Sequence, residues 1–229
     1  MLTNGLKALI TDMKTKRKLQ ITVDVLMLCI LLLQMSYSIA GELVHEILGI
    51  SLFVLFVIHH ILSAGFSKAL VKGKKTPGRI LKTAVDILLT ADVMALMFSA
   101  VIVSKHVFAF LDISTMSDIG RTAHLLGSYW GFALMSVHLG FHLDFFLNKT
   151  MKDKRKRIVT IVLMILLSSA GLVCFIHDGV YKYMLLINRF VFFDKTGGLP
   201  LFLLKYILIA VLFTSVGYTL FKIIRFEKG

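Results

Sequence analysis

The chain has 229 residues, of which 57% are hydrophobic, and its mean hydropathy is +0.84. A soluble domain of this length needs far more polar surface, so the composition excludes an ordinary soluble protein and indicates an all-α membrane protein. The net charge of +13 does not indicate a nucleic-acid partner, because the basic residues form short clusters between apolar runs.

Six apolar runs follow one another, and we expect each to form a transmembrane helix. Before them, residues 1–18 are polar and basic and form either an amphipathic surface helix or a flexible arm. The first run lacks an obvious small-residue cleavage site, which favours a retained signal anchor. The six runs cover residues 19–40, 43–62, 80–104, 122–147, 158–175 and 199–221.

The connections between these runs differ in charge. The one before residue 80 is basic and contains Pro77-Gly78 as a turn signal, and residues 148–157 hold the densest basic cluster. Residues 105–121 form a longer polar connection, and residues 178–198 mix aromatic and charged residues as an interfacial segment does. Most of the Lys and Arg residues fall on segments that share one side, so the positive-inside rule places both termini in the cytoplasm.

Four histidines are placed with equal spacing in two of the runs. His45 and His59 lie fourteen residues apart in the second run, and His124 and His138 repeat that spacing in the fourth. Fourteen helical residues rise about 21 Å and stop about 40° short of four turns, so both histidines of each run share a face. The two runs are parallel in this topology, which pairs His45 with His124 near the outer surface and His59 with His138 near the inner one.

The first four runs form an internal repeat. Val23-Asp24 opens the first run as Val85-Asp86 opens the third, and a histidine-bearing run follows each. We therefore expect a four-helix haem-binding bundle of two repeated helix pairs over residues 19–147. The rest of the chain divides into three parts. These are the basic arm (1–18), the basic loop (148–157), and two additional C-terminal transmembrane helices with their outer interfacial segment (158–229).

Imidazole pairs at two depths favour two six-coordinate haems b. A zinc or copper site would need its ligands clustered, whereas these lie at two separate levels. For His45 or His124 taken singly, the alternative to haem ligation is a histidine that simply lies in the headgroup region of the membrane. Polar groups at membrane depth are costly without a partner, which favours ligation.

Other residues are secondary candidates at the same sites. His60 could replace His59 as the inner ligand, and His142 suits a contact to a haem propionate or a quinone. Asp24 and Asp86 could accept the second N–H of a ligand imidazole, take a proton at a quinone site, or pair with Lys18 or Arg79. Small residues on the ligand helices allow either a macrocycle or a neighbouring helix to approach closely; these are Gly49, Gly127 and Gly131.

Several stretches between residues 18 and 147 resemble the flavinylation-associated cytochrome family, bacterial membrane proteins formerly described as a domain of unknown function. The most specific are Gly-Glu-Leu-Val-His-Glu-Ile-Leu-Gly (41–49), Phe-Val-Ile-His-His-Ile-Leu (56–62) and His-Leu-Leu-Gly-Ser-Tyr-Trp-Gly-Phe-Ala-Leu-Met-Ser-Val-His-Leu-Gly-Phe-His (124–142). The resemblance implies a b-type cytochrome of the bacterial cytoplasmic membrane that works beside an extracytosolic flavoprotein with covalent FMN. It also implies His45, His59, His124 and His138 as the haem ligands. A looser likeness in spacing exists to ferric reductases and quinol-oxidising cytochromes b.

The sequence thus predicts an electron-transfer subunit of a membrane oxidoreductase, not a stand-alone enzyme. No glycine-rich dinucleotide motif is present, so electrons would come from membrane quinol or a cytosolic donor. Within this class, the alternatives are a single-haem cytochrome and a quinol-oxidising cytochrome b subunit. Outside it, the alternatives are a non-haem metal or solute transporter and a passive membrane assembly subunit.

Overall fold

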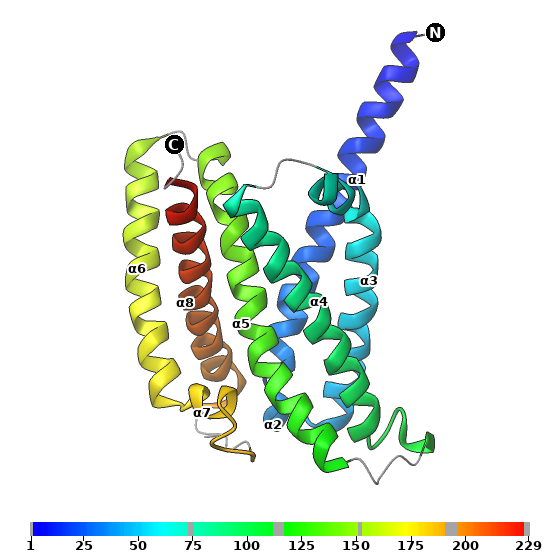
Figure 1. Cartoon of the computed structure of the whole chain (residues 1–229), viewed down its shortest axis with the longest axis vertical. Coiled ribbons are helices and arrows are strands. Elements are labelled where there is room, and N and C mark those ends of the chain that lie inside the picture. The colour runs from blue at the N-terminus through cyan, green and yellow to red at the C-terminus, as the bar shows by residue number, and fades with distance from the viewer. Residues whose placement is uncertain (1, 73–75, 112–116, 151–152, 191–196, 227–229) are drawn as a thin grey trace.

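A computed structural model gives the fold of the chain (Figure 1). It describes the backbone of residues 2–72, 76–111, 117–150, 153–190 and 197–226. Side chains are described for residues 14–63, 76–111, 118–143, 147, 153–190 and 197–224.

Within these residues all regular secondary structure is helical, in agreement with the predicted class. Most of the helices are long and lie side by side along one direction of the molecule (Figure 1). The elements in chain order are α1 (Leu2–Gln34), α2 (Tyr37–Ala40), α3 (Glu42–Lys72), α4 (Pro77–Val103), the 3₁₀ turn η1 (Ala109–Leu111), α5 (Ser117–Thr150), α6 (Lys154–His177), α7 (Val180–Met184) and α8 (Gly198–Phe226).

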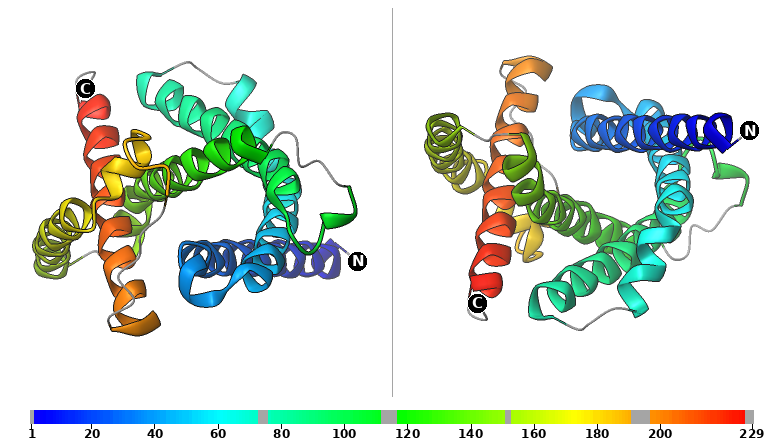
Figure 2. Two further views of the ribbon diagram at one scale, coloured as in Figure 1. Left: turned by 90° about the horizontal axis from the view of Figure 1, so that it is seen from below. Right: turned by 90° about the horizontal axis from the view of Figure 1, so that it is seen from above.

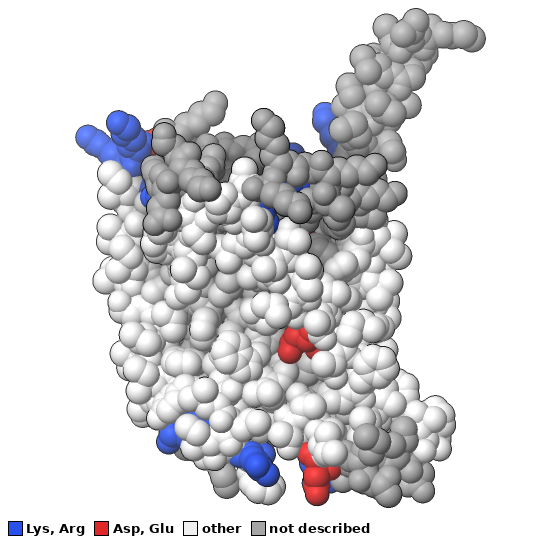
Figure 3. Space-filling view, viewed as in Figure 1, with Lys and Arg blue, Asp and Glu red and all other residues white. Residues whose placement is uncertain are grey.

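Four helices in the described part of the chain are long and apolar enough to cross a membrane. They provide the spans Glu42–Ser63, Pro77–Val103, Lys154–His177 and Gly198–Ile224. On the face shown in Figure 3, Lys and Arg gather at the two ends of the helices and an almost uncharged band lies between them. This distribution suits a protein whose middle faces lipid.

The helices alternate in direction along the chain. α1 begins and α8 ends at the same end of the molecule, and α3 and α5 run in the same direction (Figure 1). Parallel α3 and α5 place His45 and His124 toward one end, and His59 and His138 toward the end where α8 finishes.

Helix packing divides into two parts. The most closely packed pairs are α4 with α5, α5 with α8, and α6 with α8, whereas α3 packs chiefly against α1. Seen end-on in Figure 2, α8 lies between α5 and α6, and α1 and α3 lie on the other side of α5. The histidine-bearing α5 is therefore the central helix of the molecule.

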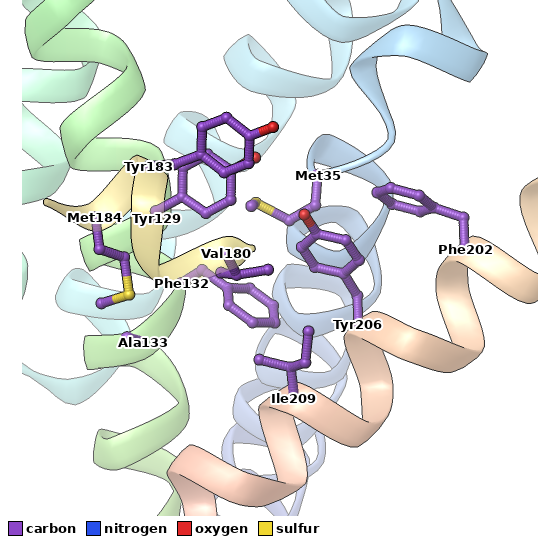
Figure 4. Packing of buried hydrophobic residues seen from close by; sticks show 10 residues of the cluster. All are labelled: Met35, Tyr129, Phe132, Ala133, Val180, Tyr183, Met184, Phe202, Tyr206 and Ile209. Carbon is purple, nitrogen blue, oxygen red and sulfur yellow. The ribbon is translucent and has the colours of Figure 1, made fainter. Parts of the chain in front are cut away.

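The larger buried cluster lies where α5, α7 and α8 meet (Figure 4). The rings of Tyr129 and Tyr183 stack at 4.9 Å, and Phe132 meets Tyr206 edge-on at 5.6 Å. The Trp130 indole N–H donates to the Met184 carbonyl oxygen at 2.9 Å, which ties α5 to the end of α7. A smaller buried cluster of Val23, Met27 and Phe56 joins α1 to α3.

Glycines allow α5 and α8 to approach backbone to backbone. A Cβ built on Gly140 would lie 2.2 Å from the Thr214 carbonyl oxygen, and one on Gly217 would lie 2.3 Å from the Val137 oxygen. Only glycine fits at such a crossing, as in other closely packed membrane helices.

The predicted boundaries were wrong at several helix ends. Pro77-Gly78 does not form the predicted turn, because Pro77 occupies the first turn of α4, where its missing N–H costs nothing. The backbone expected to form a loop after residue 62 stays helical to Lys72, and α5 begins at Ser117 instead of residue 122. Most of the basic loop 148–157 is likewise taken up by the ends of α5 and α6.

The first predicted run is also interrupted. α1 extends without a break from the basic arm to Gln34, and the short α2 follows after Ser36. The fully buried Ser36 hydroxyl donates to the Leu33 carbonyl oxygen at 2.6 Å, in addition to the Ser36 backbone N–H at 3.0 Å, where the regular helical hydrogen bonds stop. Gly41, with φ of +87°, then turns the chain into α3.

Candidate functional site

The outer histidines from α3 and α5 face each other. The ring centres of His45 and His124 lie 6.0 Å apart, with an angle of 77° between the ring planes. Two imidazoles on opposite sides of one metal ion have their centres about 6 Å apart, because each nitrogen–metal bond is about 2 Å long and each nitrogen lies about 1 Å from its ring centre. The spacing of this pair therefore fits two axial ligands of one iron.

Neutral side chains from the preceding helices contact the outer histidines. Ser99 Oγ on α4 donates to the Leu96 carbonyl oxygen and lies 3.2 Å from His124 Nδ1, so it can accept a hydrogen bond from Nδ1–H. This tautomer leaves Nε2 of His124 unprotonated, as metal ligation requires.

The Gln34 amide on α1 lies beside His45. Its oxygen accepts from Gly49 N–H at 2.9 Å, and its NH₂ donates to His45 Nδ1 at 3.0 Å and to the His45 carbonyl oxygen at 3.1 Å. In this arrangement Nδ1 of His45 is the acceptor, so a neutral His45 carries its proton on Nε2. Ligation through Nε2 would require the other tautomer, with the NH₂ donating to the carbonyl oxygen alone.

Carboxylates contact the inner histidines instead. His59 Nδ1 lies 2.6 Å from Asp24 Oδ1 of α1, and His138 Nδ1 lies 2.7 Å from Asp86 Oδ1 of α4. Of the three roles predicted for Asp24 and Asp86, these contacts match acceptance of an imidazole N–H. Each of these contacts leaves Nε2 of the histidine available to bind a metal ion.

The polypeptide covers these inner pairs only partly. The side chains of His59 and Asp24 are 30% and 51% exposed, and those of His138 and Asp86 are 25% and 30% exposed. His59 and Asp86 lie on helices apolar enough to cross a membrane, where uncovered polar groups are costly. A bound polar group between the two helix pairs would satisfy them.

The inner histidines are not in ring contact with each other. Among the described rings, contacts join His59 to His60 and His138 to His142, with centres 5.5 and 4.9 Å apart. Asp24 and Asp86 both lie within electrostatic reach of His142, so the two helix pairs approach each other at this level.

The secondary histidine candidates differ in their contacts. His60 Nδ1 lies 3.0 Å from the Phe56 carbonyl oxygen of its own helix, and its ring packs on Phe56. Among the residues whose side chains are described, His60 therefore has no carboxylate partner of the kind that His59 has. His142 is exposed and lies one turn beyond His138, as a residue in contact with a bound molecule would.

The glycine candidates face neighbouring side chains. A Cβ on Gly49 would lie 2.8 Å from the Gln34 amide, so this glycine makes room for the group beside His45. Gly127 and Gly131 both face Asp92 of α4, which matches the helix-packing alternative. Asp92 Oδ2 is buried without a described hydrogen-bond partner.

Glu46, next to His45, anchors the connection after α4. Its carboxylate accepts from Ser104 Oγ at 2.8 Å and from the backbone N–H groups of Lys105 and Val107 at 2.9 and 2.8 Å. Nearby, Lys105 donates to Glu42, and this hydrogen bond and charge raise the pKa of the Lys105 ammonium. These contacts attach the end of α4 to the start of α3 at the outer histidine level.

Three features of the site were outside the sequence predictions. Gln34, Ser99 and Glu46 contact ligand candidates or the adjoining loop, but uncharged polar residues and helix-end carboxylates give no distinctive pattern. Within the described residues, no group of three or more His, Cys, Asp or Glu side chains converges in a way that could hold a metal ion.

Comparisons with protein-family models, with curated proteins and with solved structures return no match for this chain.

Proposed function

We propose that this chain is a di-haem b-type membrane cytochrome that carries electrons across the cytoplasmic membrane of a bacterium. The observation that carries the proposal is the set of side chains around the four histidines. His45 and His124 are spaced as axial ligands of one iron, and His59 and His138 each have Nδ1 at a carboxylate, which leaves Nε2 for a second iron. Haem b would supply reversible one-electron chemistry at each level.

The protein side chains would set the orientation and the chemistry of these ligands. Asp24, Asp86 and Ser99 hold the proton of their histidine on Nδ1 and fix the ring orientation. The partly covered inner pairs and the parallel α3 and α5 support a cofactor bound between the two helix pairs. We further propose that α1 and α5 cross the membrane together with the four apolar helices, which gives six transmembrane spans.

The proposed partners follow from the sequence. An extracytosolic flavoprotein with covalent FMN would receive the electrons, and quinol or a cytosolic donor would supply them. The exposed His142, whose ring contacts that of His138, also suits a quinol-oxidising variant, because a quinol needs proton acceptors where it gives up electrons. Both termini would lie in the cytoplasm.

The test is the visible spectrum of the purified protein, oxidised and then reduced with dithionite, with haem quantified per chain. We expect a b-type Soret and α-band spectrum and two haems per chain. The double substitution His45→Ala/His124→Ala should leave one haem, as should His59→Ala/His138→Ala. The matched control His60→Ala should keep both.

A colourless protein that is correctly inserted in the membrane of haem-replete cells would overturn the proposal. Retention of one haem after loss of all four histidines would also do so. A single haem that survives loss of His45 and His124 would instead identify a single-haem cytochrome.

A further inference from the structure

We infer that Asp24 and Asp86 hold the inner histidine pair at a lower reduction potential than the outer pair, so that an electron moves from the inner site to the outer one. This inference rests on the proposed function, because it assumes that each pair binds a haem. It adds the order of the two reduction potentials and the residues that impose this order.

The two levels differ in the groups beside Nδ1 of each ligand. At the inner level both partners are carboxylates, 2.6 and 2.7 Å from His59 and His138. At the outer level they are the Ser99 hydroxyl and the Gln34 amide, both neutral. α1 and α4 thus each supply a charged partner at the inner level and an uncharged partner at the outer level.

A carboxylate that accepts from Nδ1–H makes the imidazole a more basic ligand. A more basic ligand and a nearby negative charge both stabilise the oxidised iron, and hydrogen bonding around the ligands is one of the means by which proteins tune haem potential. A hydroxyl acceptor has a weaker effect, and the Gln34 NH₂ offers no acceptor at all. Ligand basicity alone therefore places the inner potential below the outer one.

Other charges around the inner level leave this order unchanged. His142 lies within electrostatic reach of Asp24, Asp86 and Lys82, and the Lys82 ammonium lies over the Phe221 ring at 4.7 Å. One ammonium offsets part of the charge of two carboxylates. The outer level has Glu46 next to His45, but that carboxylate is engaged by Ser104 and backbone N–H groups and does not contact an imidazole in the described structure.

The consequence for transfer is a downhill step within the chain. With a haem held by each pair, one electron would pass from the iron held by His59 and His138 to the iron held by His45 and His124, so the first would be oxidised and the second reduced. The donor would then act at the end where α1 begins and α8 finishes, and the acceptor at the end that carries η1 and α7.

The experiment is a spectroscopic redox titration of the purified holoprotein at one fixed pH, fitted with two one-electron components. Asp24→Asn and Asp86→Asn keep the shape of the side chain and remove its charge. We expect each to raise the lower midpoint potential and to leave the higher one unchanged, with both haems still bound. Asp24→Glu should restore the low value, which a purely structural role would not require.

The matched opposite variant is Gln34→Glu, which places a carboxylate beside His45. It should lower the higher midpoint potential and leave the lower one in place. Proteins with a single level intact assign the components, since the variant lacking His45 and His124 should show only the lower potential.

An unchanged lower potential in both Asn variants would overturn the inference, as would a higher potential in the protein that keeps only the inner pair. Both results are obtained on haem-loaded protein. They therefore differ from failure of the proposed function, in which no haem binds or its binding does not need these histidines.

Discussion

Each predicted ligand histidine has a polar neighbour on the helix that precedes it in the chain. α1 supplies Asp24 and Gln34 to α3, and α4 supplies Asp86 and Ser99 to α5. The repeat seen in the sequence thus extends to the neighbours of the ligands. In each helix pair, one helix carries the histidine and the other carries the polar side chain that contacts it.

Part of this site could be predicted from the sequence. Asp24 and Asp86 were identified as candidates because acidic residues inside apolar runs are rare and need partners. Gln34 and Ser99 could not be identified in this way, because neutral polar residues are common in membrane helices. Their roles depend on side-chain positions that spacing alone does not specify.

Glu46 is the residue at which a substitution should most affect the connection after α4. Glu46→Gln removes the charge that strengthens its hydrogen bonds to Ser104, Lys105 and Val107. We expect a loss of about 1–2 kcal/mol of stability, since hydrogen bonds to charged groups are stronger than neutral ones. The measurement is the thermal unfolding midpoint in detergent, together with the rate of proteolysis between residues 104 and 111.

Glu42→Gln is the control for this substitution. Glu42 pairs with the exposed Lys105, and exposed ion pairs contribute little to stability. Its midpoint should stay close to that of the unmodified protein. Equal effects of the two substitutions would show that Glu46 has no special anchoring role.

At the scale of helices, apolar runs predicted where most long helices lie but not where they end. Hydropathy reports the stretch that lipid can cover, whereas a helix continues until a cap, a glycine or a proline stops it. Lys68 and Lys72 therefore stay helical beyond the apolar part of α3, and Pro77 starts α4. α7 was not predicted as a helix, because five residues are too few to show a periodic pattern.

The close crossing of α5 and α8 makes a prediction about Gly140. An alanine Cβ there would meet backbone atoms of α8 at 2.2 and 2.7 Å, so the helices must separate. We expect Gly140→Ala to cost about 1–3 kcal/mol, the usual range for overpacking, and to lower the thermal midpoint.

Gly127→Ala is the matched control on the same helix. Its nearest neighbours are Leu96 side-chain carbons at 3.1 Å, which can move aside. The change in midpoint should therefore be smaller than for Gly140→Ala. The reverse order would mean that the α5–α8 crossing tolerates a wider separation than its backbone contacts indicate.

At the scale of the whole molecule, the best-packed region does not lie between the two histidine-bearing helices α3 and α5. The buried aromatic cluster of Tyr129, Tyr183 and Tyr206 lies between α5, α7 and α8, away from the space between α3 and α5. The sequence could not predict this, because membrane helices are apolar on all sides and periodicity does not identify their inner face. Of the last two long helices, α8 therefore packs against α5, and α6 packs against α8.

The charge distribution predicts the orientation of the whole molecule. In a Cys29→Ser/Cys174→Ser background, Arg189→Cys should react with a membrane-impermeant maleimide on intact cells, because residue 189 would lie outside. Lys154→Cys should react only after the cells are permeabilised. Labelling of Lys154→Cys in intact cells, without labelling of Arg189→Cys, would reverse the orientation.

The unequal packing of the two histidine-bearing helices has a consequence for biogenesis. α5 is fixed by α4 and α8, whereas α3 packs chiefly against α1 and is tied to the rest through Glu46 and a few side chains. The later helices, including α4, α5 and α8, can thus assemble with one another, and α1 and α3 can then pack against them. The segment that leaves the ribosome first would then be the last to pack into the folded protein.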